Sequence, residues 1–87
     1  MSTAVDHLVD EARQRQEDLV RRASIDLPPV TIRRRLRIGV GLTYEDIADA
    51  FGVTSTTICR WELGHRTPRG EHLERYAELL QRLGELQ

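Results

Sequence analysis

Apolar residues recur every three or four positions along most of the chain, which is the period of an amphipathic α-helix. Short stretches rich in glycine, proline and helix-capping residues interrupt this pattern near positions 24–29, 39–43, 52–54 and 64–68. The pattern therefore predicts an all-α protein of five helices, at about 3–23, 29–38, 44–51, 55–63 and 68–86.

The two central helices have the clearest end signals. Thr43 and Asp46 have the spacing of a capping box, in which each side chain accepts a hydrogen bond from the backbone N–H of the other residue. Gly52 supplies a turn that needs a positive φ, and Thr54 is placed to cap the helix that follows. We therefore expect two short helices that cross steeply about a very tight turn.

The spacing of packing positions in this pair supports a helix-turn-helix. Such a motif needs a small residue where its helices touch, a glycine at the turn, and bulky apolar residues on both sides. Ala48, Gly52 and Ile58 follow one another at intervals of four and six residues. The other interface positions are also apolar: Ile47, Phe51, Val53 and Trp61.

The run from Arg37 to Pro68 resembles the Cro and phage-repressor (XRE-like) helix-turn-helix proteins. The matching pieces are Gly41-Leu42-Thr43, Ile47-Ala48, Phe51-Gly52-Val53, Thr57-Ile58, Trp61-Glu62, Gly64 and Pro68. The resemblance implies a repressor-like DNA-binding domain that inserts helix 54–63 into the major groove, usually as a dimer on an inverted repeat. We accordingly divide the chain into an N-terminal amphipathic helix and linker at 1–27, for docking or dimerisation, and a DNA-binding domain at 28–87.

The resemblance also implies which residues touch DNA. The base-contacting positions fall on Ser55, Thr56 and Arg60, with Cys59 beside them as a passive contact. Arginine can hydrogen-bond bidentately to guanine, and serine or threonine can donate or accept according to the base. Phosphate contacts are expected of the residues around this helix: Arg37, Tyr44, Thr54, Thr57, Arg66 and Arg69.

Two of the phosphate candidates have particular features. Tyr44 stands where the family commonly has a phosphate-contacting glutamine, and its hydroxyl can serve the same oxygen. Arg37 and Glu62 match an arginine and a glutamate that pair in the family, so Arg37 would serve the fold as well as a phosphate. Trp61 is expected in the core rather than at the DNA.

Proline marks two further helix starts. Pro29 ends the linker 24–29, and Pro68 follows the capping residue Thr67, so each suits the first position of a helix. The helix after Pro29 carries a basic edge that faces either DNA phosphates or only solvent, formed by Arg33, Arg34, Arg35 and Arg37.

The first and last helices carry more apolar surface than the motif can cover. In the first, apolar residues recur every seven positions from Val5 to Leu19, but Gln16 interrupts the companion row. We interpret this face as docking on the core or on a second subunit. In the last, Leu79 and Leu86 widen the apolar stripe beyond one partner, which favours contact with a second copy of the chain.

Charge is distributed unevenly along the chain. The net charge of −1 divides into −2 for residues 1–27, +3 for 28–70 and −2 for 71–87. A basic middle between acidic flanks suits a small nucleic-acid binder, because only the contacting face needs a positive potential.

Other chemistry finds little support in the sequence. The three histidines and Cys59 lack metal-ligand spacing, no Gly-rich phosphate loop follows a strand, and no nucleophile can be assembled with a base. We therefore expect no enzyme activity, no cofactor and no metal. The single cysteine and the lack of a signal or membrane-spanning pattern fit a cytoplasmic, nucleoid-associated protein.

The expected function is that of a sequence-specific DNA-binding transcriptional regulator, a dimeric repressor of phage or bacterial type. Two alternatives stay open. One is the antitoxin of a toxin–antitoxin pair, which represses its own operon while a surplus helix captures the toxin. The other is a helix-turn-helix used only as a protein-interaction adaptor, which predicts no retention of DNA at low salt.

Overall fold

The computed structural model describes the backbone of residues 3–87 and the side chains of residues 9–87. Within residues 3–87 the chain forms five α-helices and no strand: α1 (Thr3–Ala23), α2 (Val30–Gly39), α3 (Tyr44–Phe51), α4 (Ser55–Glu62) and α5 (Glu71–Glu85). The all-α prediction is confirmed. None of these helices is both long and apolar enough to cross a bilayer.

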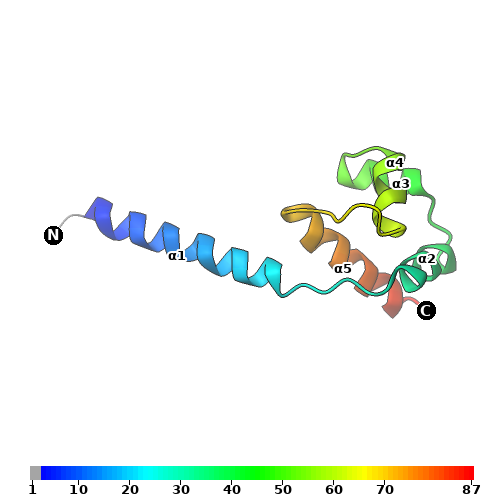
Figure 1. The fold of residues 1–87 in the computed structure, drawn as a ribbon, viewed down its shortest axis with the longest axis horizontal. Helices are drawn as coiled ribbons and strands as arrows, with labels where there is room; N and C mark the ends of the chain where they lie inside the picture. The colour runs from blue at the N-terminus through cyan, green and yellow to red at the C-terminus, as the bar shows by residue number, and fades with distance from the viewer. Residues whose placement is uncertain (1–2) are drawn as a thin grey trace.

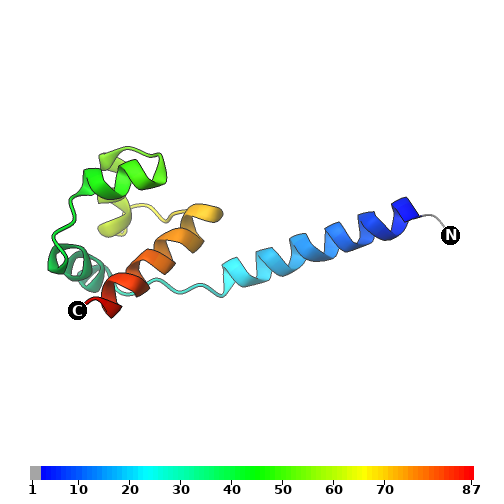
Figure 2. The same cartoon turned by 180° about the vertical axis from the view of Figure 1, so that it is seen from behind.

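Helix α1 stands apart from the other four helices (Figure 1). The molecule measures 57 × 23 × 23 Å because α1 extends away from the domain formed by α2 to α5, and the view from behind shows the same separation (Figure 2). Ion pairs tie its last turn to the first turn of α5, where Arg21 Nε lies 2.9 Å and Arg22 Nε 3.8 Å from the carboxylate of Glu74. The domain boundary predicted near residue 27 remains a proposal.

The apolar face of α1 has no cover within the described chain. Val9, Leu19 and Val20 are 51%, 63% and 69% exposed. These three residues do not pack on the core in this structure, and docking or dimerisation through residues 1–27 stays a prediction. Val5, which begins the predicted seven-residue repeat, lies outside the described side chains.

Helix α2 begins one residue later than predicted, since Pro29 is its N-cap. The run of arginines along it is not uniform. Arg33 turns inward, where its Nε donates to the carbonyl of Pro28 at 2.7 Å and its Nη1 to the carbonyl of Trp61 at 2.9 Å. Both readings of the basic edge are thus wrong for Arg33, which instead satisfies a carbonyl at the end of α4.

The helix-turn-helix forms as predicted from its caps. The Thr43 hydroxyl accepts a hydrogen bond from the backbone N–H of Asp46 at 3.1 Å, and the Asp46 carboxylate accepts one from the N–H of Thr43 at 2.8 Å. Gly52 has φ of 68°, a left-handed conformation that glycine adopts without steric cost. The Thr54 hydroxyl caps α4 by accepting from the N–H of Thr57.

The core lies where α3, α4 and α5 meet. Ile58 is fully buried, and Trp61 is 3% exposed, which confirms its place in the core. The rings of Phe51, Trp61 and Tyr76 pack at centroid distances of 5.3 to 6.4 Å in edge-on and tilted pairs. Burial raises the pKa of Tyr76 to about 12. The other buried apolar residues are Ile47, Ala48, Leu80 and Leu83.

Helix α5 starts at Glu71, three residues after the predicted position. Its N-cap is Gly70, with φ of 59°, and Pro68 is buried in the preceding loop. The predicted start at Thr67 and Pro68 is therefore wrong, because the proline packs into the domain before the helix begins. Of the two residues that widen the apolar stripe, Leu79 packs against the core and Leu86 is 73% exposed.

Candidate nucleic-acid interface

The outer face of α4 is narrow and polar. Thr56 and Arg60 are exposed and lie four residues apart, so they share one face of the helix. Ser55 and Cys59 are half-buried and lie beside that face. Helix α4 therefore offers small polar groups and a single long cation to another surface.

The N-terminus of α4 carries two linked hydroxyl groups. Those of Thr54 and Thr57 lie 2.9 Å apart, at hydrogen-bond distance. Because unpaired N–H groups and the helix dipole make a helix N-terminus attractive to anions, this end of α4 is suited to a phosphate.

Arg37 lies largely inside the protein. Its Nε donates to Glu62 Oε2 at 2.6 Å, its Nη2 to Glu62 Oε1 at 3.1 Å, and its Nη1 to the carbonyl of Leu42 at 2.9 Å. Only 13% of its side chain and 3% of that of Glu62 are exposed. The hydrogen bonds to Glu62 raise the pKa of Arg37, outweighing burial, which lowers it. The predicted pairing with Glu62 is present, and this inward position disfavours the phosphate contact expected of Arg37.

Tyr44 packs on the same arginine. The guanidinium carbon of Arg37 lies 4.1 Å from the centroid of the Tyr44 ring, which is a cation–π contact. Burial raises the pKa of Tyr44 above its ordinary value, and a hydrogen bond with Cys59 adds to the rise. A phenol of ordinary pKa is already neutral at pH 7, so Tyr44 carries a hydroxyl group there, and that group bonds with Cys59.

The loop after α4 folds back onto the end of that helix. Gly64 has φ of 75°, and the N–H groups of His65 and Arg66 then donate to the carbonyl of Arg60 at 2.9 and 3.2 Å. These bonds satisfy a terminal carbonyl of α4 and fix the start of the loop. Arg66 is thereby held close to α4.

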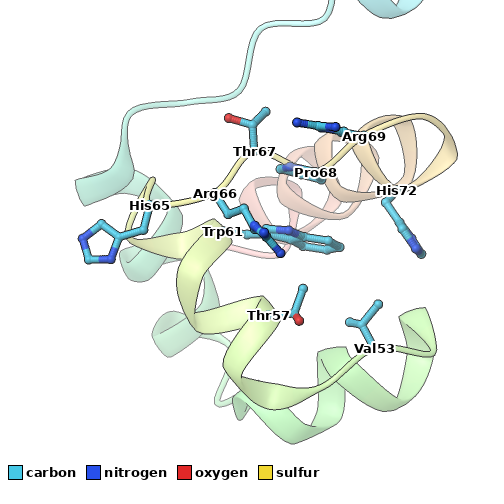
Figure 3. A pocket seen from close by; sticks show the side chains of 9 residues that line it. All are labelled: Val53, Thr57, Trp61, His65, Arg66, Thr67, Pro68, Arg69 and His72. Atoms are coloured by element: carbon cyan, nitrogen blue, oxygen red, sulfur yellow. The ribbon is translucent and has the colours of Figure 1, made fainter.

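A surface hollow of about 570 Å³ lies between α4 and this loop (Figure 3). Arg66 and Trp61 both line it, and His65 stands at one edge of the lining with its ring turned outward. The hollow brings together three residues predicted to contact phosphates from separate parts of the sequence. Its lining comprises Val53, Thr57, Trp61, His65, Arg66, Thr67, Pro68, Arg69 and His72.

His72 also lines the hollow, although the sequence did not predict it as a residue that contacts DNA. Its ring stacks on Phe51 at 6.1 Å and lies 5.6 Å from Trp61, between centroids. Its Nδ1 is buried and has no hydrogen-bond partner among the described residues. No local motif marks this histidine, because the loop that brings it to the hollow is shaped by tertiary packing.

Comparison with known families matches residues 34–85 to the helix-turn-helix family model of the Cro/C1 type. The match covers more than half of the chain and includes α3, the turn and α4. The chain belongs to the Cro/C1-type helix-turn-helix family. Comparisons with curated proteins and with solved structures give no match.

Membership of the Cro/C1-type family confirms the XRE-like resemblance. It makes the protein a DNA-binding transcription regulator, since this is a family of DNA-binding, non-catalytic domains. The match begins within α2, so α1 lies outside it.

Proposed function

We propose that this Cro/C1-type protein is a sequence-specific transcriptional repressor that inserts α4 into the major groove of its operator. The exposure of Thr56 and Arg60 on one face of α4, with Ile58 and Trp61 buried behind them, carries the proposal. Arg60 would donate to O6 and N7 of a guanine, and the Thr56 methyl would touch a thymine methyl. Ser55 and Cys59 would border this contact as additional base-contacting residues.

The surrounding residues would bind phosphates and set the register of α4. Thr54 and Thr57 stand at the N-terminus of α4, and Tyr44 offers a neutral hydroxyl at the start of α3. Arg66 and Arg69 would add positive charge from the loop. Arg37 would act as a positioning residue, because three of its N–H groups bind other parts of the protein.

The repressor would act as a homodimer on an inverted repeat in the cytoplasm, at the nucleoid. Two copies would place their α4 helices about 34 Å apart, which is one turn of DNA. The exposed face of α1 would supply contacts between subunits, because most of the stability of a helix in a protein comes from packing of its amphipathic face. In this proposal residues 1–27 form the dimerisation segment and residues 28–87 the DNA-binding domain.

The uncovered face of α1 also favours a second function, that of an antitoxin whose α1 captures a toxin. The two functions differ in their partner rather than in their DNA contacts. Purification of the chain together with its neighbouring gene products separates them, since a stoichiometric second protein bound through α1 indicates the antitoxin.

A direct titration tests DNA binding itself. A labelled duplex of mixed sequence, titrated with the protein at low salt and followed by fluorescence anisotropy, should bind with an affinity that falls steeply as salt rises. If the protein binds no DNA even at low salt, this would instead indicate a protein-interaction adaptor.

A further inference from the structure

The hollow beside α4 has an apolar wall and a polar rim. Val53, Trp61 and Pro68 supply the wall, while Thr57 and Arg66 bring a hydroxyl and a guanidinium to the rim. Deoxyribose is largely apolar on its carbon face and its phosphate is an anion, so one unit of a DNA backbone matches this division. Thr57 lies on α4 itself, which puts the hollow directly beside the helix proposed to enter the groove.

His72 brings a further hydrogen-bond donor to the same hollow. Because Nδ1 is buried without a partner among the described residues, a hydrogen on that atom would remain unbonded. In the neutral ring the hydrogen therefore belongs on Nε2. Nε2 is not among the buried, unpaired atoms of the described chain, and the ring lines the hollow.

The ring of His72 is also held in place. It stacks on Phe51 with an angle of 29° between the planes and lies at 48° to Trp61, both of which are core residues. A donor fixed in this way loses little conformational freedom when it binds, which favours its use in recognition.

We propose that the hollow seats one sugar-phosphate unit of the DNA backbone and that His72 binds its phosphate through Nε2–H, beside the charge of Arg66. This inference rests on the proposed function and adds to it a contact from α5. The contact would add to the affinity through one hydrogen bond donated from Nε2.

Two substitutions separate the donor from the ring. His72→Phe keeps an aromatic ring on Phe51 but removes the N–H, while His72→Gln keeps an N–H at a similar distance from the backbone. We expect His72→Phe to weaken binding to specific and mixed-sequence duplexes alike, by about 10- to 100-fold, as for the loss of one hydrogen bond to a charged group. His72→Gln should stay within about twofold of the wild type.

The salt dependence separates the loss of a hydrogen-bond donor from the loss of a phosphate-binding cation. At pH 8, where an ordinary imidazole carries no charge, the slope of log affinity against log salt for His72→Phe should equal that of the wild type, because no arginine has been removed. Gln81→Phe is the control on the same helix, since Gln81 is exposed and does not line the hollow, and it should leave affinity unchanged. Urea unfolding of each variant shows whether the domain stays as stable as the wild type.

Four results would overturn the inference. They are wild-type affinity in His72→Phe, an equal loss in Gln81→Phe, an equal loss in His72→Gln, or loss of affinity only in proportion to lost stability. Titration of the free protein with inorganic phosphate, followed through the NMR signals of the His72 ring, should give no saturation below about 1 mM. Tight saturation would assign the hollow to a free anion. A wild-type protein that binds no duplex would remove the proposed function itself.

Discussion

The guanidinium of Arg37 on α2 and the carboxylate of Glu62 on α4 meet through two hydrogen bonds, of 2.6 and 3.1 Å, in the interior of the domain. This contact joins the helix before the helix-turn-helix to the end of the helix proposed to read DNA. It also takes the guanidinium away from the surface. The orientation of α4 therefore depends on a charge pair that does not face the DNA.

Breaking the pair should destabilise the domain strongly. Arg37→Met leaves the Glu62 carboxylate buried and unpaired, and we expect a loss of about 3 kcal/mol in the free energy of unfolding, measured with urea. Arg37→Met combined with Glu62→Leu should recover much of the loss, since no buried charge remains. Arg34→Met, on the exposed side of the same helix, is the control and should cost little. A small effect of Arg37→Met would show that the pair is not buried in solution.

Arg66 should act on all DNA sequences alike. Arg66→Ala removes a cation from the rim of the hollow, so affinity should fall similarly for specific and mixed-sequence duplexes, and the salt slope should drop by about 1. The control is Arg82→Ala, which removes an exposed cation on α5 that pairs with Glu78. If Arg66→Ala instead changed the ratio of the affinities for specific and mixed-sequence duplexes, Arg66 would be assigned to base recognition.

The capping box of α3 should contribute to stability in a pH-dependent way. Hydrogen bonds from the backbone and side chain of Thr43 lower the pKa of Asp46 below its ordinary value of 3.8. A carboxyl whose pKa is lowered by folding stabilises the protein above its unfolded pKa and loses that effect as the pH falls through the folded value. The stability difference between the wild type and Asp46→Asn should therefore shrink as the pH is lowered below 3.8. A difference independent of pH in urea unfolding would contradict this, and Asp49→Asn serves as a control on the same helix.

The exposed face of α1 should mediate subunit contact if the protein dimerises through it. Leu19→Glu combined with Val20→Glu places charge on that face, and sedimentation should then show a shift toward monomer. Leu86→Glu, at the exposed end of α5, is the matched change on the other candidate surface. A shift in Leu86→Glu alone would assign the interface to α5.

Local signals were sufficient to predict most of the helix boundaries. The capping box at Thr43 and Asp46, the turn at Gly52 and the cap at Thr54 act within a few residues, so they can be read from the sequence. The start of α5 could not be read in this way. Pro68 has the local features of a first helical residue, but burial in the loop holds it outside the helix.

The candidate site was less predictable than the fold. Arg33, Arg34 and Arg35 are consecutive and chemically identical, yet Arg33 points inward while the other two are exposed. The direction depends on carbonyl groups at Pro28 and Trp61 that only the folded chain brings within reach. His72 likewise reaches the hollow through packing on Phe51, which no local pattern encodes.

Base recognition by Arg60 is the central claim, and selection of bound sequences from random duplex DNA tests it most directly. The wild type should enrich an inverted repeat with half-sites one helical turn apart, each with a guanine opposite Arg60. Arg60→Ala should lose about 1–3 kcal/mol on that sequence and relax the preference at one position in each half-site. The account would be contradicted if the wild type enriched no sequence, or if Arg60→Ala enriched the same sequence as the wild type.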